Sequence, residues 1–270
     1  MPIAALPLIL AIGSGGVIGL ILGLVGGGGS ILAVPLLVYV VGVPSPHVAI
    51  GTAAIAVALN AGFSLAAHAR LGTVKWRCAL VFAGAGVLGS ALGAELGKAI
   101  DGQRLLALFG LVMVAVGLSM LRPSSRPANE SVRLTRASVR HLLPRLVGLG
   151  FGVGLLAGFF GIGGGFLIVP ALMLATGMAL PNAIGTSLVA VTAFGLATAG
   201  SYATAGYIDW QLALLVIAGG VVGSIAGTRL NSVLAPKKHL LTRMFGAGVI
   251  AVGGTIVVRG LPHLVGTSAS

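Results

Sequence analysis

Long apolar stretches alternate with short polar breaks along this chain, and the pattern predicts ten helical segments. The stretches run for about 20 residues without the apolar–polar alternation of membrane β-strands, so we expect helices that cross a bilayer. An arginine-rich break separates two halves of five segments each. The expected segments are 3–25, 30–43, 47–67, 77–97 and 104–121, followed by 143–161, 165–178, 182–203, 211–230 and 241–258.

The two halves repeat each other in sequence. The glycine-rich stretch 23–35 returns at 158–170, and each copy ends on a proline. An offset of 134 or 135 residues also relates Ala-Ile-Gly-Thr at 49–52 and 183–186, Gly72 and Trp76 to Gly206 and Trp210, and 86–90 to 220–224. An internal duplication is therefore predicted. Its parts are a first membrane repeat over 1–121, a basic linker over 122–142, a second membrane repeat over 143–260 and a C-terminal tail over 261–270.

The second segment of each half is short. About 14 residues make about 21 Å of helix, against a bilayer core of about 30 Å. A glycine-rich stretch directly precedes each short segment, so we expect a broken or re-entrant helix. Irregular backbone at membrane depth is tolerated where protein buries it or where it lines a cavity.

Composition excludes a soluble protein. The chain is 57% hydrophobic and 7% charged, with a mean hydropathy of +1.12, whereas soluble domains carry about 25% charged residues. The net charge of +12 reflects the presence of four acidic residues in all, and it indicates membrane topology, not a nucleic-acid partner. The expected class is an all-α polytopic membrane bundle of about 8–10 membrane segments.

The basic residues predict an orientation. Cytoplasmic loops are rich in Lys and Arg, which puts the linker 122–142 and the turns near Lys75 and Lys237 inside. The turn at 203–210 has no Lys or Arg and is expected outside. Equivalent turns then face opposite sides, so the halves are predicted to be inverted-topology repeats with both termini in the periplasm.

The glycine stretches are the main candidate site. Unpaired N–H groups at helix starts suit a negative oxygen atom, and two such starts facing one midplane site would bind a small oxyanion. The alternative is close helix packing through small residues. Nearby hydroxyl and amide side chains are expected to form a polar wall of the same site. The substrate-binding candidates are Gly27, Gly28, Gly29, Ser30, Thr52, Asn60, Gly163, Gly164, Gly165, Thr186 and Ser187.

Each polar candidate has a structural alternative. Threonine in a helix often bonds to its own backbone. Asn60 lies eight residues after Thr52, so both can share one helix face, and an amide in a membrane needs a partner or a wet cavity. The repeat counterpart of Asn60 is Phe194, which makes any site here asymmetric.

Three titratable residues are candidates for proton coupling: His47, His68 and Glu95. The simpler interpretation makes the histidines exposed residues at helix ends and pairs Glu95 with Lys98. No nucleophile–base–acid group or Walker A motif is visible, and Cys78 stands alone. We therefore expect no enzyme activity, no cofactor and no metal site.

With these residues in view, the chain resembles the TauE/SafE family, also called the sulfite exporter family. The resemblance rests on 26–29 and 161–165, each followed by a helix with Pro35 or Pro170, and on the repeated Ala-Ile-Gly-Thr and Gly–Trp elements. It covers nearly the whole chain. It implies a multi-spanning bacterial permease of about seven to nine helices that transports sulfur-containing anions such as sulfite, sulfoacetate or other organosulfonates.

The leading hypothesis is a secondary transporter of a small sulfur oxyanion or sulfonate, including thiosulfate, which works by alternating access between the two halves. A passive small-anion channel is the first alternative. A non-transporting membrane anchor that binds another protein through the basic linker is the second. Large apolar faces also make a homodimer an alternative to a monomer.

Overall fold

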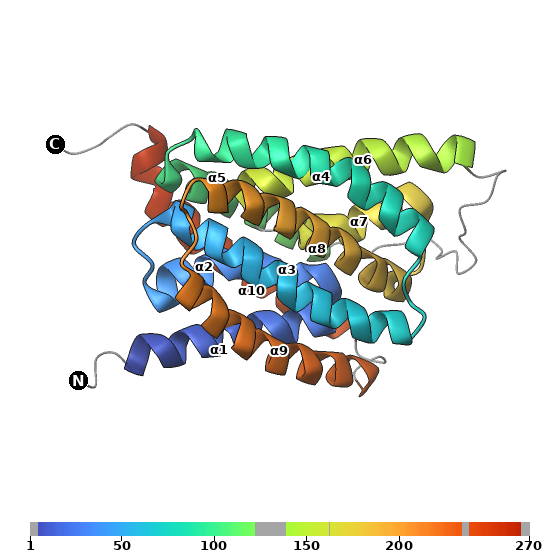
Figure 1. Cartoon of the computed structure of the whole chain (residues 1–270), viewed down its shortest axis with the longest axis horizontal. Helices are drawn as coiled ribbons and strands as arrows, with labels where there is room; N and C mark the ends of the chain where they lie inside the picture. Colours follow the sequence, from blue (N-terminus) through green and yellow to red (C-terminus); the bar gives the residue numbers. More distant parts are fainter. Residues whose placement is uncertain (1–4, 122–138, 162, 234–237, 266–270) are drawn as a thin grey trace.

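In the computed structural model, long helices lie side by side along the longest axis of the molecule (Figure 1). The structure describes residues 5–121, 139–161, 163–233 and 238–265. Each predicted segment has a helical counterpart, so the all-α prediction is confirmed. The long helices are α1 (Ala5–Val25), α3 (Pro46–Arg70), α4 (Trp76–Lys98), α5 (Gly102–Leu121), α6 (Val139–Phe160), α8 (Leu180–Thr204), α9 (Trp210–Val233) and α10 (Lys238–Val265).

Seven helices in the described part of the chain are long and apolar enough to cross a membrane. They are Leu6–Leu24, Pro46–Arg70, Trp76–Lys98, Gly102–Ser119, Leu142–Phe160, Leu180–Thr204 and Trp210–Leu230. Three further apolar helices are shorter: Gly27–Val41, Gly165–Thr176 and Gly246–Gly260. The chain is therefore a multi-pass membrane protein. The proposed linker 122–142 and tail 261–270 lie largely outside the described residues.

The two outer helix pairs are joined by glycine seams. On α1, a side chain at Gly15, Gly19 or Gly23 would collide with the backbone of α9 at Val216, Gly220 and Ser224. On α6, a side chain at Gly150, Gly154 or Gly158 would collide in the same way with α4 at Phe82, Gly86 and Ser90. Small residues let membrane helices approach closely and gain dispersion contacts. These three contacts of the first pair each have a repeat equivalent in the second.

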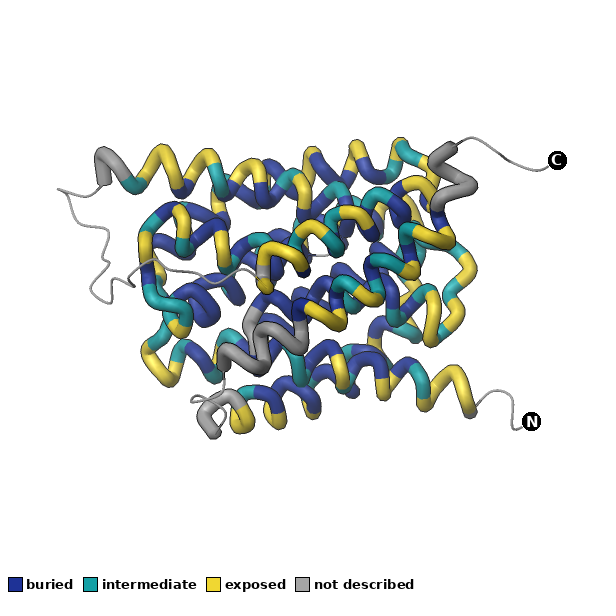
Figure 2. The backbone as a smooth tube through the Cα atoms, turned by 180° about the vertical axis from the view of Figure 1, so that it is seen from behind, coloured by how far each residue is buried: buried dark blue, intermediate teal, exposed yellow. Residues whose placement is uncertain are grey.

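Two further pairs join equivalent helices of the two halves. Helix α3 packs on α8, and α5 packs on α10. Gly195 of α8 faces Ala58 and Ala54 of α3, while Gly62 faces Thr192. Figure 2 shows that the buried residues gather on the helix faces turned toward the middle of the bundle. Each half thus exchanges its outer helices with the other half across a shared α3–α8 centre.

The order in which residues meet along each helix pair gives the relative directions of the helices. Residue numbers rise together in the α1–α9 and α4–α6 pairs, so those neighbours run parallel, whereas they run in opposite order in α3–α8 and α5–α10. Figure 1 agrees, because α3 and α8 progress in opposite directions along the long axis. Every long helix of the first half therefore runs opposite to its sequence equivalent in the second half.

Equivalent turns close the central helices. Gly72 (φ +69°) follows α3 and Gly206 (φ +72°) follows α8, and both use the left-handed conformation that glycine adopts without a Cβ penalty. Trp76 and Trp210 then begin α4 and α9 and are largely exposed. Tryptophan is enriched at membrane interfaces. Because α3 and α8 run in opposite directions, the two turns lie at opposite ends of the bundle.

The short segments differ between the halves. In the second half, α7 (Gly165–Thr176) is a regular α-helix. In the first half, Gly26–Leu32 winds as a 3₁₀-helix (η2), Ala33–Pro35 is one α-turn (α2), and Leu36–Val41 is a π-helix (η3). Four consecutive glycines have poor α-helix propensity, and Pro35 lacks the N–H that a regular helix needs. The predicted short segment 30–43 is helical, and its winding changes from 3₁₀ to α to π along its length.

Candidate functional site

The two glycine stretches meet in the interior of the bundle. Gly27 and Gly165 approach so closely that a Cβ on either would collide with the backbone of the other. The backbone N–H of Gly27 points at the hydroxyl oxygen of Ser187 on α8, at an N···O distance of 3.4 Å. Ser187 in turn donates to the carbonyl of Ile184 at 2.7 Å. Candidates from three separate segments of the sequence are thus neighbours in the fold.

Gly163 lies between the two central helices. A methyl group added there would stand 3.5 Å from Cγ1 of both Val57 on α3 and Val191 on α8. These two valines are repeat equivalents, and a Cβ at Gly27 would also contact Val191 at 2.8 Å. We call Gly27, Gly163, Gly165 and Ser187, with the two valines, the glycine centre.

The backbone conformation of the second stretch requires glycine. Gly161, Gly163 and Gly164 have φ of +67°, +62° and +63°, a region that costs other L-residues about 1–2 kcal/mol. The carbonyl of Gly164 accepts the N–H groups of Leu167 at 2.9 Å and Ile168 at 3.1 Å, which starts α7. These glycines therefore redirect the chain abruptly from α6 into α7.

The first stretch turns without positive φ values. Ser30 donates its hydroxyl to the carbonyl of Gly27 at 2.9 Å, which holds the 3₁₀ winding. Gly29 packs back against Ile18 and Leu22 of α1, and Gly28 is buried beside it. The two stretches therefore differ in geometry, and only the second leads into a regular α-helix.

Thr52 and Thr186 bond across the halves, not to their own helices. Thr52 Oγ1 accepts the backbone N–H of Asp209 at 3.0 Å. Thr186 Oγ1 accepts the backbone N–H of Lys75, also at 3.0 Å. Both threonines are fully buried. Each one satisfies a free N–H at the start of a helix in the opposite half, so the hydroxyls of these two candidates hold the turns.

Asn60 is fully buried against α9. Its side chain packs directly on Gly220, and neither Nδ2 nor Oδ1 has a hydrogen-bond partner among the described residues. Thr52 and Asn60 both contact the α9 side, so the prediction that they share a face of α3 is confirmed. The equivalent position holds Phe194, whose ring packs on Gly86.

The three proton-coupling candidates lie near the ends of the bundle, away from the glycine centre. His47 stacks on Tyr207 with 5.4 Å between ring centroids. His68 is only 3% exposed, and its Nδ1 is 3.1 Å from the hydroxyl of Thr73, so the expectation of an exposed histidine is wrong there. Glu95 pairs with Lys98 at 2.8 Å and accepts the hydroxyl of Ser201 at 2.8 Å.

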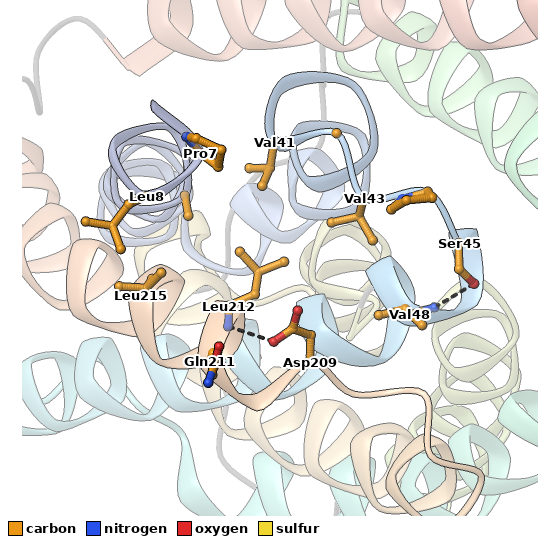
Figure 3. A pocket seen from close by; sticks show the side chains of 13 residues that line it. Pro7, Leu8, Val41, Val43, Ser45, Val48, Asp209, Gln211, Leu212 and Leu215 are labelled. Atoms are coloured by element: carbon orange, nitrogen blue, oxygen red, sulfur yellow. Dashed lines mark hydrogen bonds between the residues drawn. The ribbon is translucent and has the colours of Figure 1, made fainter. Parts of the chain in front are cut away.

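The glycine centre is electrically neutral. Its polar groups are peptide groups and one hydroxyl, and the described residues contain no group of three His, Cys, Asp or Glu side chains that could hold a metal. A separate cavity of about 490 Å³ opens at one end of the bundle, between α1, the 41–45 segment, α3 and α9. Figure 3 shows Asp209 at its edge, with its carboxylate accepting the N–H of Leu212. This cavity is mostly apolar and reaches Val48, one turn of α3 before Thr52.

Several structural neighbours of the site were missing from the sequence-based candidates. Val57 and Val191 contact Gly163, and their equal offset in the two repeats was a signal that could have found them. Ser64 and Ser224 have buried hydroxyls without partners among the described residues. Ser64 follows Asn60 by one helical turn, a spacing that the sequence displays.

The geometry defines a polytopic membrane protein with a buried, uncharged centre between two related halves. The family model for the sulfite exporter TauE/SafE matches residues 11–256. The chain therefore belongs to the TauE/SafE family.

Relatives carry the same general description. A probable membrane transporter protein of Xylella fastidiosa is 51% identical over 258 residues, which cover 96% of this chain and 98% of the relative. The probable membrane transporter protein YunE of Bacillus subtilis is 28% identical, with 91% and 97% covered. A probable membrane transporter protein of Methanocaldococcus jannaschii is 26% identical, with 94% and 95% covered. No solved structure matches the chain. The family and these names indicate a membrane transporter, not an enzyme.

Proposed function

We propose that this protein is a secondary transporter of small sulfur-containing anions: sulfite, thiosulfate, sulfoacetate or another organosulfonate. The observation that carries the proposal is the meeting of Gly27 and Gly165 beside Ser187, where both glycine stretches converge on one buried point. Transporters built from repeats place their substrate at such an interface. The choice of sulfur anions rests on the family, whose model is described as a sulfite exporter.

Substrate recognition would come from neutral donors. Peptide N–H groups of the glycine segments can bind an oxyanion without the desolvation cost of a buried cation, and the Ser187 hydroxyl would join them by exchanging its bond to the Ile184 carbonyl for one to the anion. Among the described residues no carboxylate faces this centre to repel an anion, since Glu95 is in an exposed pair with Lys98 and Asp101 and Asp209 accept N–H groups at the starts of α5 and α9. Residues 27–30 and 163–165 would form the binding wall. Glu95, His47 and His68 remain candidates for proton coupling.

The two halves would act as inverted-topology repeats. Two observations support this: equivalent helices run in opposite directions, and Thr52–Asp209 mirrors Thr186–Lys75. Movement of one half against the other would alternate access to the glycine centre. The cavity beside Asp209 would be the vestibule on the outer side, and the shorter segments would act as re-entrant elements at the centre.

The proposed orientation puts the basic linker in the cytoplasm and both chain ends in the periplasm of a bacterial inner membrane. The support is the excess of Lys and Arg on one side of the predicted topology. In Figure 1, the start of α1 and the end of α10 lie at the same end of the bundle. Exposed leucines along α4, including Leu80, Leu88, Leu92 and Leu96, offer a lipid-facing or homodimer surface.

Counterflow in liposomes tests the proposal. Purified protein is reconstituted, the vesicles are loaded with unlabelled sulfite, thiosulfate or sulfoacetate, and uptake of the labelled anion is followed. A transporter gives saturable uptake that rises with internal substrate. Flux without saturation or counterflow would indicate the channel alternative, and absence of flux for all three anions would refute the sulfur-anion proposal.

A further inference from the structure

Helices α3 and α9, which pack on each other, carry four buried polar atoms that lack partners among the described residues. They are Nδ2 and Oδ1 of Asn60, Oγ of Ser64 and Oγ of Ser224. These side chains are 0%, 1% and 3% exposed. A buried polar group without a hydrogen bond is destabilising, because it has given up its hydration without a replacement partner. A membrane interior offers no bulk water to repay that cost.

The helix register brings these atoms to one place. Thr52 contacts Asp209 and Asn60 contacts Gly220, so α3 and α9 run parallel with residue numbers rising together. Ser64 lies one turn after Asn60, and Ser224 lies one turn after Gly220. Residues four apart share a helix face, so this register puts Ser64 and Ser224 one turn beyond the Asn60–Gly220 contact, on the same faces of α3 and α9. We call Asn60, Ser64 and Ser224 the α3–α9 polar site.

This site adjoins the glycine centre. Val57 touches the position of Gly163, and Asn60 follows Val57 by three residues, which puts the two side chains next to each other on the surface of α3. Both positions lie near the middle of α3, which spans Pro46–Arg70. The glycine centre and the Asn60 amide therefore lie beside adjacent parts of the α3 surface.

The equivalent interface in the other half is filled and apolar at its key position. Phe194 replaces Asn60, stacks on Phe82 with 6.1 Å between ring centroids, and packs on Gly86. Ser90, the equivalent of Ser224, donates its hydroxyl to the carbonyl of Val87 at 3.0 Å. Thr198 and Tyr202 of α8 keep hydroxyls without partners among the described residues. Phe194 nevertheless leaves the second half without a buried amide at the position equivalent to Asn60, so the two interfaces differ.

We propose that the α3–α9 polar site binds the oxygen atoms of a small oxyanion through the Asn60 amide and the two serine hydroxyls, and that it is the specificity-determining part of the transport pathway. This inference rests on the proposed function. Neutral N–H and O–H donors suit an anion that must be released again, and the aromatic ring of Phe194 prevents a second binding mode in the other half.

The test uses the full chain with sulfite as the probe and two readouts: counterflow in liposomes, and the sulfite-dependent rise of the melting temperature in detergent. Asn60→Leu removes the amide at similar volume. Ser64→Ala with Ser224→Ala is the gentler variant if the first fails to fold. Thr198→Val is the matched control, because it removes an equally buried hydroxyl from the equivalent interface.

Asn60→Leu should raise the half-saturating sulfite concentration at least tenfold in both readouts, and the double serine variant should raise it severalfold. Thr198→Val should stay within twofold of the wild type. Wild-type behaviour of the first two variants, or an equal loss in Thr198→Val, would overturn the polar site while leaving transport intact.

The thermal readout separates this inference from the proposed function. A wild-type melting shift that Asn60→Leu removes, without any flux, would support the site and reject transport of sulfite. If sulfite does not change the melting temperature of the wild-type protein, the polar site is overturned for this anion. The site is also overturned if Asn60→Leu is more stable than the wild type and its flux is unchanged, because the interface would then bind no ligand.

Discussion

The hydroxyl oxygen of Thr52 accepts the backbone N–H of Asp209 across 3.0 Å, and this bond joins the first half of the chain to the turn before α9 in the second. Thr186 makes the equivalent bond to Lys75 at the same distance. Each threonine thus holds the turn that orients a helix of the opposite half. The pair links the internal duplication of the sequence to a physical contact.

Thr52→Val and Thr186→Val should destabilise the protein by similar amounts. Each change leaves a partly buried N–H unpaired, at a cost of about 1–3 kcal/mol. Thr→Ser at either position keeps the acceptor oxygen and should recover most of the loss. Thermal unfolding in detergent measures both. Valine variants as stable as the serine variants would show that these bonds contribute nothing to stability.

Gly19→Leu and Gly154→Leu should separate the outer helix pairs. A side chain at either glycine meets the backbone of the facing helix, so the helices must move apart and lose dispersion contacts. Overpacking typically costs about 1–3 kcal/mol, and more is expected where backbone is the obstacle. Yield of monodisperse protein on size-exclusion chromatography reports the loss.

Gly13→Leu and Gly148→Leu are the controls for these seams, because nothing lies within 4 Å of a Cβ at either glycine. These variants should purify as the wild type does. Equal damage at all four positions would mean that leucine disturbs the helices themselves and not their packing.

Gly163→Ala should reduce transport more than stability. The methyl group meets only ordinary contacts, 3.5 Å from Val57 and Val191, so the main folding cost is the positive φ, about 1–2 kcal/mol. The same methyl occupies the glycine centre, and counterflow should fall about tenfold. Retained counterflow in a destabilised protein would assign Gly163 to chain direction alone.

Single cysteines should label from opposite sides of the membrane. Leu71 follows α3 and Ala205 follows α8, and both are exposed in equivalent turns. Both variants are made in a Cys78→Ser background and treated with a membrane-impermeant maleimide. Leu71→Cys should react only when the cytoplasmic side is opened to the reagent, whereas Ala205→Cys should react in intact cells whose periplasm the reagent can enter. Labelling of both from the same side would reject the inverted orientation.

The sequence predicted the helical class, the ten segments and the paired turns, because those features depend on local composition and on repetition along the chain. Gly72 and Gly206 close equivalent helices as their sequence context indicates. The sequence also marked the glycine stretches as special. It did not reveal that η2 and η3 wind as 3₁₀- and π-helices, because the local effects of four glycines and Pro35 compete with packing against α1.

The partners of individual side chains were decided only by the tertiary structure. Thr52 and Thr186 had a local alternative, bonding to their own helices, and only the exchange of helices between the halves brings Asp209 and Lys75 within reach. Asn60 and Phe194 occupy equivalent positions, yet one leaves unpartnered polar atoms against α9 and the other packs on α4. Periodicity and composition act between neighbours in sequence and so fix the segments, while contacts across 111 and 157 residues depend on how the helices pack.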